Sequence, residues 1–150
     1  MSLRPTSELV AVQWLKGVTG IPTNSVATDL PADNSTWSAS GFVQVMSVGG
    51  SPNIYMPVAQ PVIQVDLWAV NPNSSKPPWG KANQLAESIR MGTLDHANVG
   101  RLLTGFPAAY NNARCLTVYP LSEPRRIRDD SADFAHYTMD LQFMWVEVLP

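Results

Sequence analysis

The hydrophobic period of the sequence changes within residues 61–94, from two residues to about 3.6. From Val62 to Val70, apolar side chains alternate with Gln64, Asp66 and Trp68, which predicts a strand with one buried face. After a break rich in proline and serine, apolar residues recur at helical spacing, namely Ala82, Leu85, Ala86 and Ile89. This spacing predicts a helix from residues 79–80 to residues 91–92 that covers the buried face of the strand.

The same two periods predict the other elements of the chain. Thr6 or Ser7 is placed to cap a first helix that ends at Gly17. Apolar runs predict strands at residues 41–48 and 113–119, and the spacing of three apolar residues, Leu102, Leu103 and Phe106, predicts another helical turn. Residues 121–123, between two prolines, predict a short extended piece.

The longest alternating run lies at residues 134–148. Its apolar face holds Tyr137, Met139, Leu141, Phe143 and Trp145. At about 3.4 Å per residue, such a strand is longer than the usual five or six residues, so it spans the whole sheet or overhangs it.

The order of elements is helix, strand, strand, helix, strand, strand, without a recurring βαβ unit or an internal repeat. We therefore expect an α+β fold: an antiparallel sheet of about four strands, with the N-terminal helix and the central helix packed on one face. The length of 150 residues predicts a single domain, residues 1–150.

Composition favours protein–protein contact. Charged residues make up 15% of the chain, against about 25% in an ordinary soluble domain. Five tryptophans and six methionines add to this weakly charged, apolar character, so we expect the chain to oligomerise. A net charge of −2 disfavours a dedicated nucleic-acid binder, and neither a signal peptide nor a membrane-spanning run is evident. The single cysteine, Cys115, predicts folding in an intracellular compartment.

The residue types used in catalysis do not gather in the sequence. His96 and His136 lie forty residues apart without other ligands at metal-binding spacing, and Cys115 lies in a strand pattern without an evident base. Glycine-rich nucleotide loops and the nucleophile-elbow motif of hydrolases are also missing from the sequence. We therefore expect no catalytic residue, cofactor or metal site, and no enzymatic activity.

Two segments are candidates for contact with other subunits. Residues 54–56, Ile-Tyr-Met, lie in an apolar stretch that Pro57 and Pro61 interrupt, so the stretch is either an arm that reaches a neighbour or a loop folded over its own core. The charged cluster at residues 125–130 combines three arginines with two aspartates. Its charges nearly cancel, which favours a solvated loop or a set of ion pairs between subunits over an anion site.

Two stretches resemble a known family. Residues 61–69, Pro-Val-Ile-Gln-Val-Asp-Leu-Trp-Ala, with the helix that begins Lys81-Ala-Asn-Gln-Leu-Ala-Glu-Ser-Ile-Arg, resemble the central block of the tail terminator or tail completion proteins of long, non-contractile-tailed phages and prophages. The arginine-rich stretch at 125–130, the long final strand and an N-terminal helix with Trp14-Leu15 fit the same layout. The resemblance covers most of the chain in the order of its elements, and residues 61–90 and 123–146 at the level of residues.

The resemblance implies a ring, typically a hexamer, on the head-proximal end of the tail tube, where it ends tube polymerisation and prepares head–tail joining. It implies as partners other copies of the chain, the tail tube protein and the head connector protein, and as location the virion tail, after assembly in the bacterial host cytoplasm. Two alternatives stay open: a head-completion or connector adaptor, and a small-ligand-binding or enzymatic α+β domain with polar groups converging from Gln64, Asp66 or His136. We expect interface roles for Arg125, Arg126, Arg128, Asp129, Asp130, Ile54, Tyr55, Met56 and Trp68, the last on the outward face of its strand.

Overall fold

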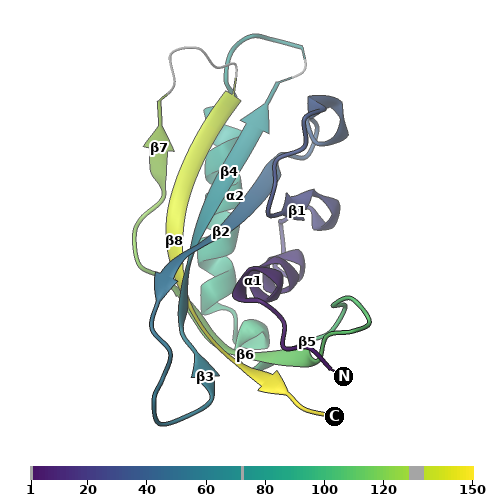
Figure 1. Ribbon diagram of the computed structural model, residues 1–150. Helices are drawn as coiled ribbons and strands as arrows, with labels where there is room; N and C mark the ends of the chain where they lie inside the picture. Colours follow the sequence, from purple (N-terminus) through teal and green to yellow (C-terminus); the bar gives the residue numbers. More distant parts are fainter. Residues whose placement is uncertain (1, 72, 129–133) are drawn as a thin grey trace.

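The longest strand, β8 (Phe134–Val148), runs through the middle of an eight-stranded sheet in the computed structural model of the chain, which describes residues 2–71, 73–128 and 134–150 (Figure 1). Four strands pair with β8, all antiparallel to it. On one side lie β3 (Val58–Ala59) and β4 (Pro61–Val70), and on the other lie β6 (Asn112–Pro120) and β7 (Arg125–Ile127). The prediction that the last strand spans the sheet is confirmed.

The expected sheet of about four antiparallel strands is wrong. The sheet is mixed, in the order β1-β2-β4-β8-β6-β5, with β3 and β7 paired only to β8. Its remaining strands are β1 (Val26–Ala27), β2 (Phe42–Gly50) and β5 (Arg101–Leu103), and β1 runs parallel to β2. The predicted helical turn at Leu102, Leu103 and Phe106 is wrong: Leu102 and Leu103 belong to β5, and Phe106 lies in the irregular stretch after it. Strands of two or three residues are too short to show a hydrophobic period, which is why the sequence missed them.

Two helices cover one face of the sheet, which we call the inner face. They are α1 (Ser7–Lys16) and α2 (Trp79–Leu94). The chain also contains three short 3₁₀ segments, η1 (Thr23–Ser25), η2 (Asn34–Thr36) and η3 (His96–Asn98). Thr6 caps α1 by accepting a hydrogen bond from the backbone N–H of Leu9 at 3.2 Å, as the sequence predicts. Both helices bury apolar residues in one continuous core with the inner face of β2, β4, β6 and β8.

The sheet curls into a half-barrel around this core, and β8 bends along its length (Figure 1). The pairing shifts between Ser47 and Gly49 in β2 and between Cys115 and Thr117 in β6. Such bulges bend a strand and increase its twist, so both support the curl. Among the residues described, the helices are neither long nor apolar enough to cross a membrane.

Arg101, at the start of β5, ties the ends of both helices together. Its guanidinium donates to the backbone carbonyl of Gln13 near the end of α1, and to Oδ1 of Asn98 at 2.7 Å. The Asn98 amide in turn donates to the carbonyl of Gly92 near the end of α2 at 2.8 Å. Helix ends leave carbonyls without intrahelical partners, and the half-buried Arg101 and the buried Asn98 together supply donors to both helix ends.

Replacing Arg101 with Met should lower the free energy of unfolding by about 2–3 kcal/mol, because the carbonyls at the end of α1 and the Asn98 amide lose a charged partner. Urea denaturation of the purified protein measures this loss. The matched control is Arg114→Met, which removes an exposed guanidinium that donates to the Gly100 carbonyl at 2.8 Å. Equal losses in the two variants would contradict the role of Arg101.

Cys115 lies on the inner face of β6 opposite Trp145, and it is fully buried. Burial raises the pKa of its thiol to about 12, against which the nearby Arg101 acts only weakly. A buried, protonated thiol reacts slowly with thiol reagents, as expected for a cysteine with a packing role.

Labelling of Cys115 by a thiol reagent at pH 7–8 should therefore be at least about a thousandfold slower in the native protein than in urea, because reaction requires unfolding. Absorbance at the wavelength of the released chromophore follows the reaction. Native labelling at the unfolded rate would show that the thiol is accessible.

Candidate interaction surface

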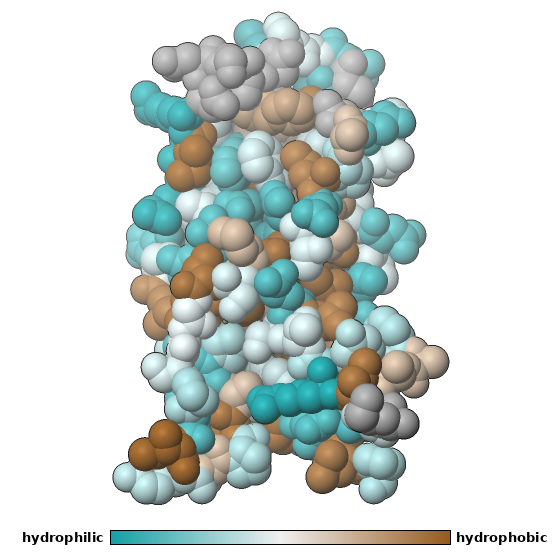
Figure 2. Space-filling model, in the orientation of Figure 1, coloured by the Kyte–Doolittle hydropathy of each residue, from teal (hydrophilic) through white to brown (hydrophobic). Residues whose placement is uncertain are grey.

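The connection between β2 and β3, residues 51–57, projects beyond the sheet and carries apolar side chains into solvent. Ile54, Tyr55 and Met56 are 82%, 88% and 56% exposed. The side-chain oxygen of Asn53 accepts hydrogen bonds from the N–H groups of Tyr55 and Met56 at 2.8 and 3.1 Å, which fixes the turn. Figure 2 shows hydrophobic atoms at the lower left corner of the molecule, where Figure 1 shows this connection. We call residues 51–57 the tip loop.

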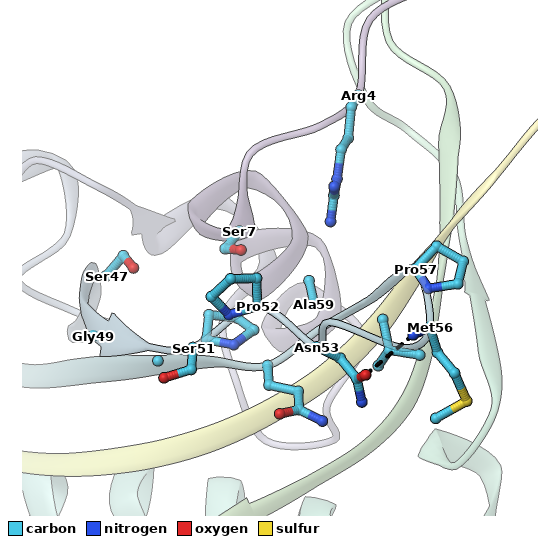
Figure 3. A pocket seen from close by; sticks show the side chains of 14 residues that line it. Arg4, Ser7, Ser47, Gly49, Ser51, Pro52, Asn53, Met56, Pro57 and Ala59 are labelled. Atoms are coloured by element: carbon cyan, nitrogen blue, oxygen red, sulfur yellow. Dashed lines mark hydrogen bonds between the residues drawn. The ribbon is translucent and has the colours of Figure 1, made fainter.

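The tip loop leaves β2 at Gly50, whose φ of +110° and close approach to the Gln60 carbonyl exclude a side chain. Between the tip loop and the start of α1 lies a hollow of about 300 Å³ (Figure 3). Arg4 points into this hollow, and its guanidinium also lies 4.9 Å from the ring of Trp145. The base of the loop at Gly50 thus lies close to Gln60, whereas Ile54 and Tyr55 at its apolar tip are left in solvent.

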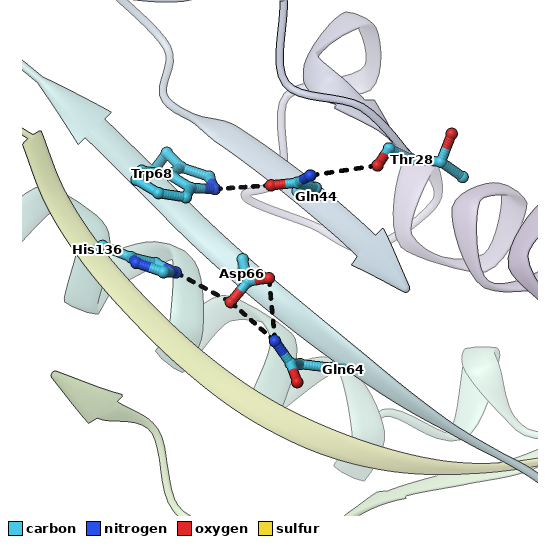
Figure 4. A network of polar contacts seen from close by, with 6 residues as sticks. All are labelled: Thr28, Gln44, Gln64, Asp66, Trp68 and His136. Atoms are coloured by element: carbon cyan, nitrogen blue, oxygen red, sulfur yellow. Dashed lines mark hydrogen bonds and ion pairs between the residues drawn. The ribbon is translucent and has the colours of Figure 1, made fainter. Parts of the chain in front are cut away.

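A chain of polar contacts crosses the outer face of the sheet, opposite the helices (Figure 4). Nε2 of His136 on β8 lies 2.9 Å from Oδ1 of Asp66 on β4, and Gln64 also donates to this carboxylate. On the same face, the indole N–H of Trp68 donates to Gln44 of β2 at 3.1 Å. The Gln44 amide donates to the backbone carbonyl of Thr28, the residue just after β1. The contacts therefore involve β2, β4 and β8 and reach the end of β1.

Trp68 lies on the outer face as predicted, but it is partly covered. Its ring stacks on the His136 imidazole with a centroid distance of 3.8 Å and an angle of 13°. The sequence predicted an exposed Trp68, and it offered Gln64, Asp66 and His136 as converging groups of a ligand site rather than as a pair that bonds within the sheet. In the sequence, Asp66 and His136 both occupy outward positions of strands with alternating polarity. The register that brings them together, with Trp68 opposite His136, is a property of the fold.

The environment of Asp66 favours its ionised form. Burial acts to raise the pKa of the carboxyl group, whereas the hydrogen bonds from His136 and Gln64 act to lower it. The hydrogen bonds prevail, so the pKa of Asp66 lies below its ordinary value of 3.8. Since an ionised carboxylate only accepts hydrogen bonds, Nε2 of His136 carries the proton between them.

The structure separates the three arginines of the charged cluster. In the register of β7 with β8, Arg125 lies opposite Thr138 and faces the outer side of the sheet, whereas Arg126 lies opposite Tyr137 and faces the helices. The Arg126 guanidinium lies 3.8 Å from the ring centroid of Trp79 at the start of α2, a cation–π contact within the domain. Arg128 is exposed just after β7. Asp129 and Asp130 lie outside the described residues.

The outer-face contacts do not form a ligand pocket. The polar groups of Gln64, Asp66 and His136 bond to one another, and the core beneath them is filled: Ile63, Val65 and Ile89 are fully buried. Within the described ranges, His, Cys, Asp and Glu do not gather in groups of three that could hold a metal ion. The arrangement is that of a polar ladder that holds strands together.

The sequence matches no protein-family model and no curated protein. The structure is similar to a chain of a solved structure described as the virion of a native gene transfer agent (GTA) particle, with a TM-score of 0.51 and 14% sequence identity. The match covers 95% of this chain and 87% of that chain. The likeness therefore extends over the whole domain, and at this identity it establishes a shared fold.

Asp66→Asn should flatten the dependence of stability on acid pH. Because the folded pKa of Asp66 is lowered, its ionised form stabilises the fold above pH 3.8, and this contribution disappears as pH falls through the folded pKa. Urea denaturation at several pH values below 5 should show that the free energy of unfolding of the wild type exceeds that of Asp66→Asn by an amount that decreases as the pH falls. A difference that stays constant across this range would contradict the assignment.

Proposed function

We propose that the chain is a structural subunit of a phage-like particle that acts by assembling with copies of itself. Three independent features support a virion role: the fold shared with a chain of the GTA virion, the resemblance of residues 61–90 and 123–146 to tail terminators, and the low charge of the chain. Within that role, we propose a ring, a hexamer in its typical form, that ends polymerisation of the tail tube and receives the head connector.

The observation that carries the proposal is the exposure of Ile54, Tyr55 and Met56 on the tip loop. Large apolar side chains that project from a fixed turn contribute nothing to the core of their own domain, and water disfavours their exposure. A neighbouring copy in a ring would cover them, and each buried side chain of this size contributes about 1.5–3 kcal/mol. The proposed partners beyond the ring are the tail tube protein and the head connector protein.

The polar outer face is consistent with a structural role without catalysis. The partly covered Trp68 would meet a partner through its exposed edge, together with Arg125 of β7. Arg128 is better placed than Arg126 for an ion pair between subunits, because Arg126 already stacks on Trp79.

Replacing Ile54 and Tyr55 together with Ser should weaken self-association at least about tenfold, since 1.4 kcal/mol already corresponds to that factor. Sedimentation velocity of the purified protein, from micromolar to hundreds of micromolar, measures the association. The matched control replaces Met91 and Leu94 with Ser; these residues are 57% and 65% exposed and belong to helix α2, not to the tip loop.

The outcomes are distinct. Rings in the wild type and in the α2 control, with monomers in the tip-loop variant, support the proposal. A wild type that stays monomeric over this range, both alone and with purified tail tubes, would exclude a ring subunit. Position of the gene beside that of the major tail protein would favour the terminator over a head-completion adaptor.

A further inference from the structure

At each of the two edges of the sheet, part of a long strand is not paired with any strand among the described residues. Strand β1 pairs with β2 only at Val43 and Gln44, so the second half of β2 has no partner on that side among the described residues. Strand β5 likewise pairs with β6 only as far as Cys115. We call residues 46–50 of β2 and residues 117–120 of β6 the two open edges.

The open edges lie at the same level of the sheet. Ser47 pairs with Ile63, Ile63 with Leu141, and Leu141 with Pro120, so one row of residues joins the two edges. The next row joins Gly49 to Tyr119 in the same way, through Val62 and Gln142. A second copy placed beside the first in the same orientation would therefore bring open edge against open edge.

The strand directions also match. Strands β2, β4, β8 and β6 alternate strictly, since each neighbouring pair is antiparallel. Strand β6 of one copy would thus run antiparallel to β2 of the next, and the alternation would continue across the contact. Such a contact joins two different surfaces, which is the arrangement that generates rings rather than two-fold dimers.

The side chains on the two edges are complementary in character. Met46 and Val48 on the β2 edge are 48% and 47% exposed, and Tyr119 and Leu121 at the β6 edge are 46% and 50% exposed. Met46 and Tyr119 point to the outer face, because they pair with the outward residues Gln64 and Gln142. Leu121 follows on the row of Met46, since its N–H donates to the carbonyl of Asp140. In the contact between two copies, Met46 would meet Leu121 on one row, and Tyr119 would lie opposite Gly49, next to Val48.

We infer that the open edge of β2 in one copy pairs antiparallel with the open edge of β6 in the next copy, with Met46 and Val48 packed on Tyr119 and Leu121. The occupant of each edge is thus a second copy of this chain, in head-to-tail order. The inference rests on the proposed self-assembly and adds to it which surfaces meet and in what register.

Cysteine cross-linking tests this pairing, in a background with Cys115→Ala so that only introduced thiols react. Opposed residues on antiparallel strands have Cα atoms about 4.5–5.5 Å apart, within the range that a disulfide requires. Met46→Cys and Leu121→Cys are made separately and together, and each sample is oxidised and run on a non-reducing gel. Met91→Cys is the matched control, since Met91 is 57% exposed and lies on helix α2 rather than on an edge strand.

We expect mixed dimers when the Met46→Cys and Leu121→Cys proteins are combined, little dimer from either alone, and a ladder of multimers from the protein that carries both. Strong dimers from Met46→Cys alone would indicate two-fold pairing of β2 with itself and would overturn the inference. Sedimentation of the same samples separates the two claims: assemblies without edge cross-links overturn the edge pairing alone, whereas monomers without cross-links overturn both.

Discussion

The pairing of β8 with four other strands is the constraint on which the rest of the structure depends. Its inward residues Met139, Leu141 and Phe143 are fully buried, and both helices pack over them. Because side chains alternate along a strand, a slip of one residue in this pairing would turn the whole apolar set to solvent. The register of β8 therefore decides which face the helices cover and which polar groups meet on the other face.

The outer face follows from the same register. Asp66 and His136 come together because β4 and β8 pair with Trp68 opposite His136, and the stacked Trp68 then shields their hydrogen bond from water on one side. Hydrogen bonds in a shielded environment are stronger than in water, provided that all partners are satisfied. The polar contacts across β2, β4 and β8 thus stabilise the middle of the sheet from the face that the helices leave uncovered.

The parts of the fold that the sequence predicts are those long enough to show a period. The strand at 61–70, the helix that follows it and the strand at 134–148 each repeat their pattern several times. Strands β1, β3, β5 and β7 contain two or three residues and are held by backbone pairing with longer strands, so the number and mixed direction of the strands could not be predicted. In the candidate surface, prolines around residues 54–56 predicted an irregular apolar segment, whereas the contact of Arg126 with Trp79 depends on tertiary structure.

The open edges are short, and their length affects how readily such a subunit would pair with unrelated strands. Pro120 ends the β6 edge and has no N–H to donate, and Gly50 ends the β2 edge with a left-handed φ. Each open edge is thus four or five residues long, and a pairing of that length is marginally stable through backbone hydrogen bonds alone. The proposed association would therefore also have to bury apolar side chains, and Met46, Val48, Tyr119 and Leu121 are the exposed apolar groups at the two edges. Short edges with matched apolar groups therefore favour a single head-to-tail contact over the open-ended stacking of exposed strands.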